Sequence, residues 1–162
     1  MTPVQIAIDG PVAAGKGDIA SRLAIELGYL YIYTGAMYRA LALACIQAGT
    51  SFKDKERVVS LLDQITIDLE ESEKDSKYPC IVLLNNSDVT ERILEQDVAM
   101  GSSDVSTIAE VRQEMVKRQQ GLAQGKNVVM EGRDIGLRVL LNAFKIYLTA
   151  TVEERARRRW EQ

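Results

Sequence analysis

The sequence predicts an α/β protein in which helices flank a mainly parallel sheet. Short runs of apolar and often β-branched residues alternate along the chain with longer segments of helical periodicity. The first apolar run, at residues 4–8, leads directly into a turn with glycines and then into a helical pattern. Strands that alternate with helices form parallel sheets, because each crossover lays a helix on one face. The length suits one core, so we expect a single domain over residues 1–162.

The N-terminal part of the chain contains a clear helix signal. Ile19, Leu23 and Leu27 are spaced at i, i+4 and i+8, which predicts one apolar stripe facing the core. Gly28 follows at the position where helices commonly end. The elements expected in this part are a strand at 4–8, a helix at 15–27, a strand at 29–33, a helix at 34–47 and a helix at 54–63.

The pattern changes in the middle of the chain. Residues 65–69 alternate between apolar and polar, as a half-exposed strand does, and an apolar run follows at 80–84. The segment between them is charged and typical of a loop, and Asn85-Asn86-Ser87-Asp88 is typical of a turn. We therefore expect a small antiparallel insert over residues 64–90. Beyond it the pattern predicts helix at 90–94 and over most of 98–124, strands at 126–130 and 144–148, and a basic helix from 152 onward.

Composition excludes several classes of function. The net charge of −3 argues against general affinity for nucleic acid or for an anionic membrane surface. The chain has no histidine, which removes His-based triads and His metal sites, and we expect no metal-ligating cluster. Cys45 and Cys80 lie in apolar surroundings, so we expect reduced core residues. No signal peptide or membrane span is evident, and we expect a cytoplasmic monomer with small-molecule partners.

A loop with a characteristic glycine spacing opens the first predicted helix. The pattern Gly10-x4-Gly15-Lys16 is that of a phosphate-binding P-loop, in the strand-to-helix context that this motif requires. Glycines let consecutive main-chain amides turn toward one anion, and the helix N-terminus adds positive partial charge. Lys16 can neutralise charge on the terminal phosphates during transfer. The candidate ATP-binding residues are Gly10, Pro11, Val12, Ala13, Ala14, Gly15, Lys16, Gly17 and Asp18.

Two residues after the lysine bear on this site. Gly17 stands where a hydroxyl residue usually binds magnesium, so we expect Mg²⁺ to be held by water and substrate oxygens. Asp18 favours the helix dipole but would repel a bound phosphate if its carboxylate pointed inward. Pointing outward, it would be only an acid at a helix N-terminus. The sequence leaves both orientations open.

Further polar residues could form a site for the phosphate acceptor. Two of them, Arg133 and Asp134, follow a predicted buried strand at the kind of strand end where α/β proteins bind ligands. Taken singly, the arginines could equally be solvated, and Arg133 and Asp134 could form a salt bridge. The basic helix could likewise be an exposed segment that complements its own dipole. The candidates for acceptor binding are Thr34, Arg39, Ser103, Arg112, Arg133 and Asp134.

Together these segments resemble the bacterial cytidylate kinases. The resembling strings follow the order and spacing of that family over essentially the whole chain, and those at 34–39 and 131–136 are specific to it among P-loop kinases. The strings are Ile8-Asp9-Gly10-Pro11, Ala14-Gly15-Lys16-Gly17, Thr34-Gly35-Ala36-Met37-Tyr38-Arg39-Ala40, Ser103-x-Val105, Val111-Arg112, Glu131-Gly132-Arg133-Asp134-Ile135-Gly136 and Glu154-Arg155-Ala156-x-Arg158-Arg159.

The resemblance implies a fold and an activity. The fold is of the P-loop NTPase type, similar to nucleoside monophosphate kinases, with an acceptor-binding region that carries the antiparallel insert. The activity is transfer of the γ-phosphate of ATP to CMP or dCMP, with Mg²⁺, giving ADP and the nucleoside diphosphate. We expect direct in-line transfer, because the acceptor phosphate is already anionic and needs little help from a general base.

The resemblance also implies roles for individual residues. Guanidinium groups can pair with a phosphate dianion through two hydrogen bonds at once, and acceptor oxygens of Ser or Asp suit the N4 donor of cytosine. In the family, the basic last helix leads into a mobile lid whose arginines clamp ATP. The implied sets are Arg39, Arg112 and Arg133 for the CMP phosphate, Ser103 and Asp134 for the base and sugar, Thr34 as a further CMP-binding residue, Lys16 and Arg133 for catalysis, and Arg155 and Arg159 near the lid.

The sequence also departs from the family. The family continues beyond the position of Gln162 with a lid and a last strand, so this chain resembles a C-terminally truncated member. With fewer cations around the developing charge and less exclusion of water, we expect a weak kinase or an inactive fragment. The substituted positions are Asp18 for a Thr, Tyr33 for an Asp, Leu94 for an Arg, and Leu137-Arg138 for a Thr-Val pair.

Three functional hypotheses follow. The leading one is an ATP-dependent CMP/dCMP kinase. The second is a nucleotide-binding fragment with little or no turnover, which the substitutions and the missing lid favour. The third is a different P-loop kinase, for AMP or shikimate, against which the string at 131–134 and the insert at 64–90 both argue.

Overall fold

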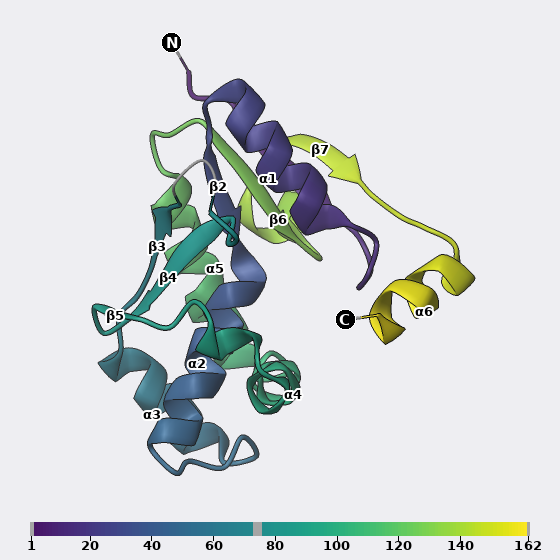
Figure 1. Cartoon of the computed structure of the whole chain (residues 1–162). Coiled ribbons are helices and arrows are strands. Elements are labelled where there is room, and N and C mark those ends of the chain that lie inside the picture. Colours follow the sequence, from purple (N-terminus) through teal and green to yellow (C-terminus); the bar gives the residue numbers. More distant parts are fainter. Residues whose placement is uncertain (1, 73–75, 162) are drawn as a thin grey trace. The chain divides into compact units, whose positions relative to one another are not determined.

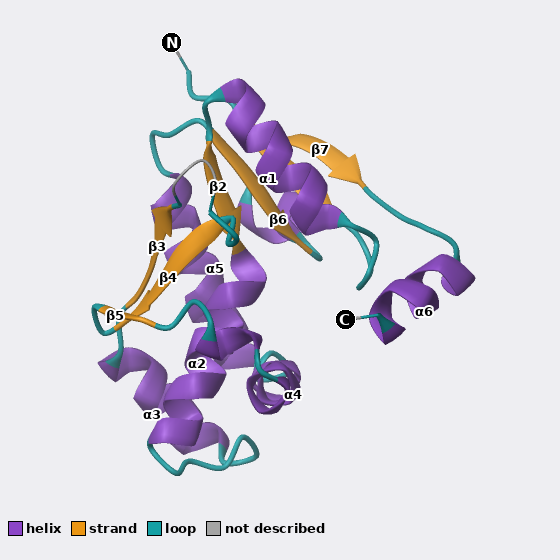
Figure 2. Cartoon of the chain, in the orientation of Figure 1, coloured by secondary structure: helices purple, strands orange, loops and turns teal. Residues whose placement is uncertain are grey.

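The computed structural model describes residues 2–72 and 76–161 of the chain. Main-chain contacts group the residues into two compact units. Unit 1 comprises Met1–Tyr33 and Gln119–Gln162, and unit 2 comprises Thr34–Arg118. Figure 1 labels the elements, and Figure 2 shows that each unit combines helices with strands. The α/β class, the parallel sheet and the small antiparallel sheet expected from the sequence are all present.

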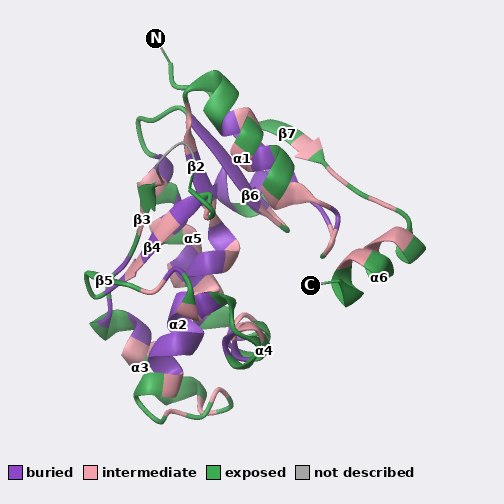
Figure 3. Cartoon of the chain, viewed as in Figure 1, coloured by how far each residue is buried: buried purple, intermediate pink, exposed green. Residues whose placement is uncertain are grey.

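Unit 1 is built on a four-stranded parallel sheet. The two central strands are buried along nearly their whole length, as unbroken apolar runs predict for strands covered on both faces (Figure 3). Because all strands run in the same direction, their carboxyl ends share one edge, where Asp9 pairs with Gly132. The order of the strands is β2 (Leu30–Tyr33), β6 (Val128–Gly132), β1 (Gln5–Asp9) and β7 (Phe144–Tyr147).

Helix α1 (Lys16–Leu27) packs on β6 and β2 through its smallest side chains. Ala20 and Ala24 are buried, whereas Ile19 and Leu27 are 44% and 43% exposed. The predicted stripe at positions 19, 23 and 27 was therefore wrong. The inward face is shifted by one residue, because alanines at i and i+4 let the helix lie close against the sheet. The predicted stop is confirmed, since Gly28 forms the left-handed C-cap.

Unit 1 also contains helical elements after β6. A five-residue π-helix, η2 (Ile135–Val139), follows β6 and was not predicted. Helix α6 (Val152–Trp160) was predicted and begins with Thr151 as its N-cap, whose hydroxyl accepts from the Glu154 amide at 3.2 Å. No residue of α6 is buried, and the helix shows only exposed and intermediate colours in Figure 3. None of the described helices is both long and apolar enough to cross a membrane.

Unit 2 is mainly helical around α2. Met37, Leu41 and Cys45 on α2 have no exposed surface. The helix packs against α4, and Gly101 on α4 approaches Phe52 so closely that a Cβ atom would overlap its ring. The predicted helix over most of 98–124 is interrupted at residues 106–108. The helices are α2 (Thr34–Gln47), α3 (Lys55–Gln64), α4 (Gln96–Val105) and α5 (Ala109–Ala123, whose residues from Gln119 belong to unit 1), with a 3₁₀ turn, η1 (Arg92–Leu94).

The insert predicted in this region forms a three-stranded antiparallel sheet. Its order is β3 (Ile67–Glu71), β4 (Cys80–Leu84) and β5 (Ser87–Asp88). The predicted turn is shorter than its four residues, since only Asn85 and Asn86 turn, with φ values of 50° and 63°. Two successive asparagines with positive φ are typical of a two-residue hairpin turn, which leaves the next two residues to pair with β4. Cys45 and Cys80 are both buried and free, as expected.

Candidate active site

The loop between β1 and α1 contains three residues with positive φ. Gly10 has a φ of 154°, and a Cβ atom there would overlap the carbonyl oxygen of Leu148. Ala13 and Gly15 have φ values of 59° and 88°, a left-handed conformation that is uncommon for alanine. Gly15 is also the N-cap of α1, and it has no side chain that could accept from the amides of the first turn. The helix start at Lys16 therefore offers amides and positive partial charge to a ligand.

Lys16 bends back across this loop. Its Nζ donates a hydrogen bond of 2.9 Å to the carbonyl oxygen of Pro11. Burial lowers the pKa of Lys16, Glu131 and Asp9 oppose this effect, and the positive charge of Arg133 adds to it. The structure thus brings together two candidate catalytic residues of unit 1, Lys16 and Arg133, within range of electrostatic interaction.

A buried carboxylate lies behind the loop. Glu131, at the end of β6, is 6% exposed and accepts a hydrogen bond of 2.7 Å from the Tyr31 hydroxyl. Burial raises the pKa of Glu131, while the Tyr31 hydrogen bond and the charge of Lys16 lower it. A Cβ atom at Gly17 would lie 3.1 Å from Oε1 of Glu131. Steric crowding therefore explains the glycine at position 17, because a larger residue would press on the carboxylate of Glu131.

The carboxylate of Asp18 points away from the loop. It forms an ion pair of 3.1 Å with Arg22, one turn further along α1, and both side chains are exposed. Of the two orientations that the sequence left open, the structure shows the outward one. Asp18 is thus an acid near a helix N-terminus, and its side chain does not repel a phosphate from inside the loop.

Asp9 connects the end of β1 to the turn after β6. Its carboxylate is buried and accepts hydrogen bonds from the amides of Ile135 and Gly136, at 2.8 Å and 2.9 Å. These amides belong to the start of η2, whose N-cap residue, Asp134, does not cap it with its own side chain. A residue of β1 therefore performs the capping role for a helix that lies far away in the sequence.

The acceptor candidates in unit 1 follow β6 directly. Arg133 is exposed and Asp134 is partly buried. Nε of Arg138 lies 3.1 Å from Oδ2 of Asp134, so an arginine one helical turn later forms an ion pair with this carboxylate. The pairing involves one of the substituted positions, Arg138, and a candidate for CMP binding.

The acceptor candidates in unit 2 come from three helices. Thr34 is buried at the start of α2, and Arg39 on the same helix donates from Nη1 to the carbonyl oxygen of Ile93 at 2.9 Å. Ser103 is exposed on α4, where its hydroxyl donates to the carbonyl oxygen of Ala99 at 3.4 Å. Arg112, near the start of α5, is partly buried. Thus four candidates lie in unit 2 and two in unit 1.

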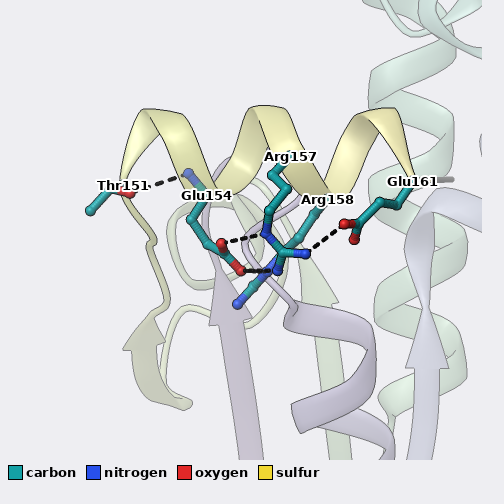
Figure 4. A network of polar contacts seen from close by, with 5 residues as sticks. All are labelled: Thr151, Glu154, Arg157, Arg158 and Glu161. Atoms are coloured by element: carbon teal, nitrogen blue, oxygen red, sulfur yellow. Dashed lines mark hydrogen bonds and ion pairs between the residues drawn. The ribbon is translucent and has the colours of Figure 1, made fainter.

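A network of charged side chains orders helix α6 (Figure 4). The carboxylate of Glu154 accepts from Nε and Nη2 of Arg157, at 3.0 Å and 2.8 Å, and from Nε of Arg158 at 2.7 Å. Hydrogen bonds from these two arginines lower the pKa of Glu154 to about 2. Glu161 holds Arg157 from its other side at 2.6 Å. The carboxylates thus fix the direction of both guanidinium groups.

One arginine of α6 reaches the loop. Nη1 of Arg158 lies 3.1 Å from the position that a Cβ atom would take at Gly15, so its charge stands beside the N-cap of α1. The basic residues proposed from the sequence were Arg155 and Arg159. Nε of Arg155 is buried and has no hydrogen-bond partner among the described residues. The structure thus places Arg158, another arginine of the same helix, beside the loop, and the lid-side role of Arg155 and Arg159 stays a prediction.

Comparison with known proteins decides the family. The family model for cytidylate kinase matches residues 6–162, nearly the whole chain. The chain belongs to the cytidylate kinase family. The curated cytidylate kinase of Caldicellulosiruptor bescii is 48% identical over 99% of this chain and 70% of its own length. That of Halalkalibacterium halodurans is 48% identical over 100% and 72%, and that of Geobacillus kaustophilus is 50% identical over 98% and 70%.

A solved structure of a protein from Thermus thermophilus aligns with 100% of this chain and 73% of that chain, at a TM-score of 0.46 and 17% sequence identity.

In this cytidylate kinase family member, sequence reasoning missed several residues of the site. Asp9 and Glu131 were quoted only as parts of strings, and Tyr31 was assigned to a strand without a role. A polar residue at the end of an apolar strand was the available signal for Asp9 and Glu131, because such positions collect at one sheet edge. Tyr31 and Arg158 gave no such signal, since a tyrosine in a strand and an arginine among arginines are both common.

Proposed function

We propose that this chain transfers the γ-phosphate of ATP to CMP or dCMP, producing ADP and CDP or dCDP. The supporting observation is the turn at residues 10–15, which leads into a helix start without a side-chain cap beside Lys16. It stands in a chain that matches the cytidylate kinase family over residues 6–162. The relatives named cytidylate kinases support the acceptor.

The donor phosphates would bind to the main chain of the loop. The candidate set is residues 10–18, in which amides and the helix start supply positive partial charge. Lys16 would leave the Pro11 carbonyl and contact the terminal phosphates, where its charge matters most as the bond breaks. Arg158, held by Glu154, would contribute a second cation beside Gly15, together with the proposed lid-side residues Arg155 and Arg159.

The acceptor would bind to guanidinium and hydroxyl groups. Arg133 is exposed within electrostatic range of Lys16, which suits a group that contacts the transferred phosphate. Direct in-line transfer requires no nucleophilic side chain, since a phosphate oxygen of CMP attacks. The proposed acceptor residues are Thr34, Arg39, Ser103 and Arg112 in unit 2 and Arg133 and Asp134 in unit 1.

Magnesium would enter with ATP. Among the described residues, no group of three or more carboxylate or thiolate side chains could form a metal cage. Gly17 also offers no hydroxyl, and its Cα faces a buried carboxylate. The donor set therefore fits a Mg²⁺ ion held by phosphate oxygens and water, which supplies charge neutralisation when bound. We further propose that the protein acts as a monomer in the cytoplasm on these small molecules.

The test is release of ADP by the 162-residue chain with MgATP and each of CMP, dCMP, UMP and AMP. We expect release with CMP and dCMP to exceed that with UMP and AMP. Binding of ATP and CMP in a calorimeter without any release of ADP would instead support a nucleotide-binding protein without turnover. Equal release with all four acceptors would contradict the proposed substrate class. The family match favours turnover over the binding-only alternative.

A further inference from the structure

Asp9 is held in place by its own main chain. It is the last residue of β1 and pairs with Gly132 of β6 in the parallel ladder. Its carbonyl oxygen accepts from the amide of Leu148 at 2.8 Å, so it is also tied to the strand on its other side. The next residue, Gly10, opens the phosphate loop. Asp9 is therefore a fixed point from which the donor loop begins.

The side chain of Asp9 holds a second part of the chain, the start of η2. Its two carboxylate oxygens accept one hydrogen bond each, Oδ1 from the Ile135 amide at 2.8 Å and Oδ2 from the Gly136 amide at 2.9 Å. The residue is 9% exposed, so water competes little with these bonds. Hydrogen bonds to an ionised acceptor are stronger than those between neutral groups. These two hydrogen bonds hold the start of η2 at the end of β1, and we call them the clamp.

Two residues lie between the fixed points. The chain is held at Gly132 by the strand pairing and at Ile135 by the carboxylate, and Arg133 and Asp134 form the turn that connects them. Asp134 does not cap η2 with its own side chain, so the turn relies on the remote carboxylate for this contact. The clamp therefore sets the path of the main chain from which both acceptor candidates project.

The clamp leaves little free space. A Cβ atom at Gly136 would lie 3.0 Å from Cγ and Cδ of Lys145 and 3.4 Å from Oδ2 of Asp9. A methyl group at this position would be crowded by the Lys145 side chain, so that either Lys145 or the main chain at residue 136 must shift. The start of η2 therefore lies close to the side chain of Lys145 on β7.

We infer that Asp9 is a positioning residue for phosphoryl transfer, which holds the Arg133–Asp134 turn at a fixed place relative to the start of the phosphate loop. Asp9 contacts neither substrate in this arrangement and acts through the turn. The inference rests on the proposed function for the role of Arg133 and Asp134, but the clamp itself can be tested without turnover.

The first experiment measures hydrogen exchange in the full chain. In Asp9→Asn, the side-chain NH₂ would face one of the two amides, and we expect exchange at Ile135 and Gly136 to rise about tenfold or more. Asp54→Asn is the matched control, since Asp54 accepts from the Arg57 amide at the start of α3 and lies outside the candidate site. Unchanged protection of Ile135 and Gly136 in Asp9→Asn would overturn the inference.

The second experiment separates positioning from general stability. We expect Asp9→Asn to raise the KM for CMP about tenfold and to change the KM for ATP less, whereas Asp54→Asn changes neither. In a double-mutant cycle on kcat/KM for CMP, the effect of Asp9→Asn should largely vanish in an Arg133→Ala background, because the effect passes through that residue. Additive effects, or equal increases in both KM values, would overturn the inference.

A third variant, Gly136→Ala, tests the same inference if Asp9→Asn does not fold. Gly136→Ala keeps the carboxylate and places a methyl group 3.0 Å from the side chain of Lys145. Because this crowding strains the main chain at residue 136, we expect a rise in exchange there and the same preferential rise in the KM for CMP. An unchanged KM for CMP in this variant, with raised exchange, would show that the clamp does not position the turn. If the wild-type chain transferred phosphate to no nucleotide, the proposed function would fail while the exchange result still decided whether the clamp exists.

Discussion

The Tyr31 hydroxyl donates a hydrogen bond of 2.7 Å to Oε1 of Glu131, and the same oxygen would lie 3.1 Å from a Cβ atom at Gly17. The three residues come from β2, β6 and the first turn of α1. The first turn of α1, which belongs to the proposed donor site, therefore packs against a buried, hydrogen-bonded carboxylate. This contact leads to three predictions, for Gly17, Glu131 and Tyr31.

Gly17→Ala should weaken both the fold and the donor site. The added methyl group would press on a buried carboxylate, and overpacking of this kind costs about 1–3 kcal/mol of unfolding free energy. Because the first turn of α1 would shift, we also expect a higher KM for ATP. Thermal denaturation and steady-state kinetics measure the two effects.

Gly121→Ala is the matched control for this variant. Gly121 lies in α5, and a Cβ atom there meets nothing within 4 Å. The substitution should stabilise the protein by roughly 0.5–1 kcal/mol, as alanine does in a helix interior. Equal stability changes in the two variants would contradict the steric role of Gly17.

The pH dependence of stability should show the burial of Glu131. Burial raises the pKa of this carboxyl above its ordinary value of 4.5, so the folded state keeps the proton to a higher pH than the unfolded state does. Between 4.5 and the raised pKa, the folded state binds more protons, and the contribution of Glu131 to stability falls as the pH rises. Subtracting the unfolding free energy of Glu131→Gln from that of the wild type at each pH should isolate this fall.

Tyr31→Phe extends the same measurement. The hydroxyl lowers the pKa of Glu131, so its loss should raise that pKa and widen the pH window in which stability falls. We expect a cost of about 1–3 kcal/mol at neutral pH, since a buried carboxylate loses a donor. A wild-type difference curve that rose with pH over this window would contradict the direction given for Glu131.

Lys16→Ala should reduce turnover far more than it reduces acceptor binding. Removal of a charge that stabilises the transferred group commonly costs about 100- to 1000-fold in kcat, and the KM for CMP should change little. Lys117→Ala is a suitable control, because Lys117 is exposed and pairs only loosely with Glu114, at 3.7 Å. Turnover of Lys16→Ala at the wild-type rate would exclude the proposed role.

Local patterns in the sequence sufficed for most of the fold. The apolar runs within β1, β6 and β4 are unbroken at residues 6–8, 128–130 and 80–84. Glycine spacing marked the loop at 10–15, and both signals lie within a few residues of sequence. The packing face of α1 was predicted wrongly, because periodicity alone favours large apolar residues, whereas Ala20 and Ala24 are the residues that pack on the sheet. The hydrogen bonds of Asp9 to the start of η2 were not predicted for a different reason. Asp9 lies 126 residues from Ile135, and no local pattern records that pairing.

Glu154→Gln should weaken the hold on Arg158. With a smaller attraction to residue 154, the guanidinium would leave its place beside Gly15, and we expect the KM for ATP to rise roughly two- to fivefold, the range of an exposed ion pair. Glu153→Gln, one residue earlier on the exposed side of α6, is the control. Equal KM values for ATP in the two variants would exclude a role for Glu154.

The lowered pKa of Glu154 sets the pH below which its hydrogen bonds to the arginines of α6 are lost. The pKa of Glu154 is lowered from 4.5 to about 2 in the folded chain. The contribution of Glu154 is therefore fully present above 4.5 and is lost as the pH falls through about 2. The effect of Glu154→Gln on the KM for ATP should accordingly be constant between pH 5 and pH 8 at fixed salt, and a strong dependence within that range would contradict the lowered pKa.

Arg138→Val should change acceptor binding without affecting the donor. The guanidinium of Arg138 lies 3.1 Å from the carboxylate of Asp134 and therefore competes with a nucleotide for it, if Asp134 faces the base and sugar as proposed. Because Arg138 is 65% exposed, the competition is weak, and we expect the KM for CMP to fall roughly two- to threefold while the KM for ATP stays constant. In an Asp134→Asn background, Arg138→Val should have no further effect, because the carboxylate for which Arg138 and the nucleotide compete is absent. A fall in both KM values, or a persisting effect in the double variant, would show that Arg138 acts elsewhere.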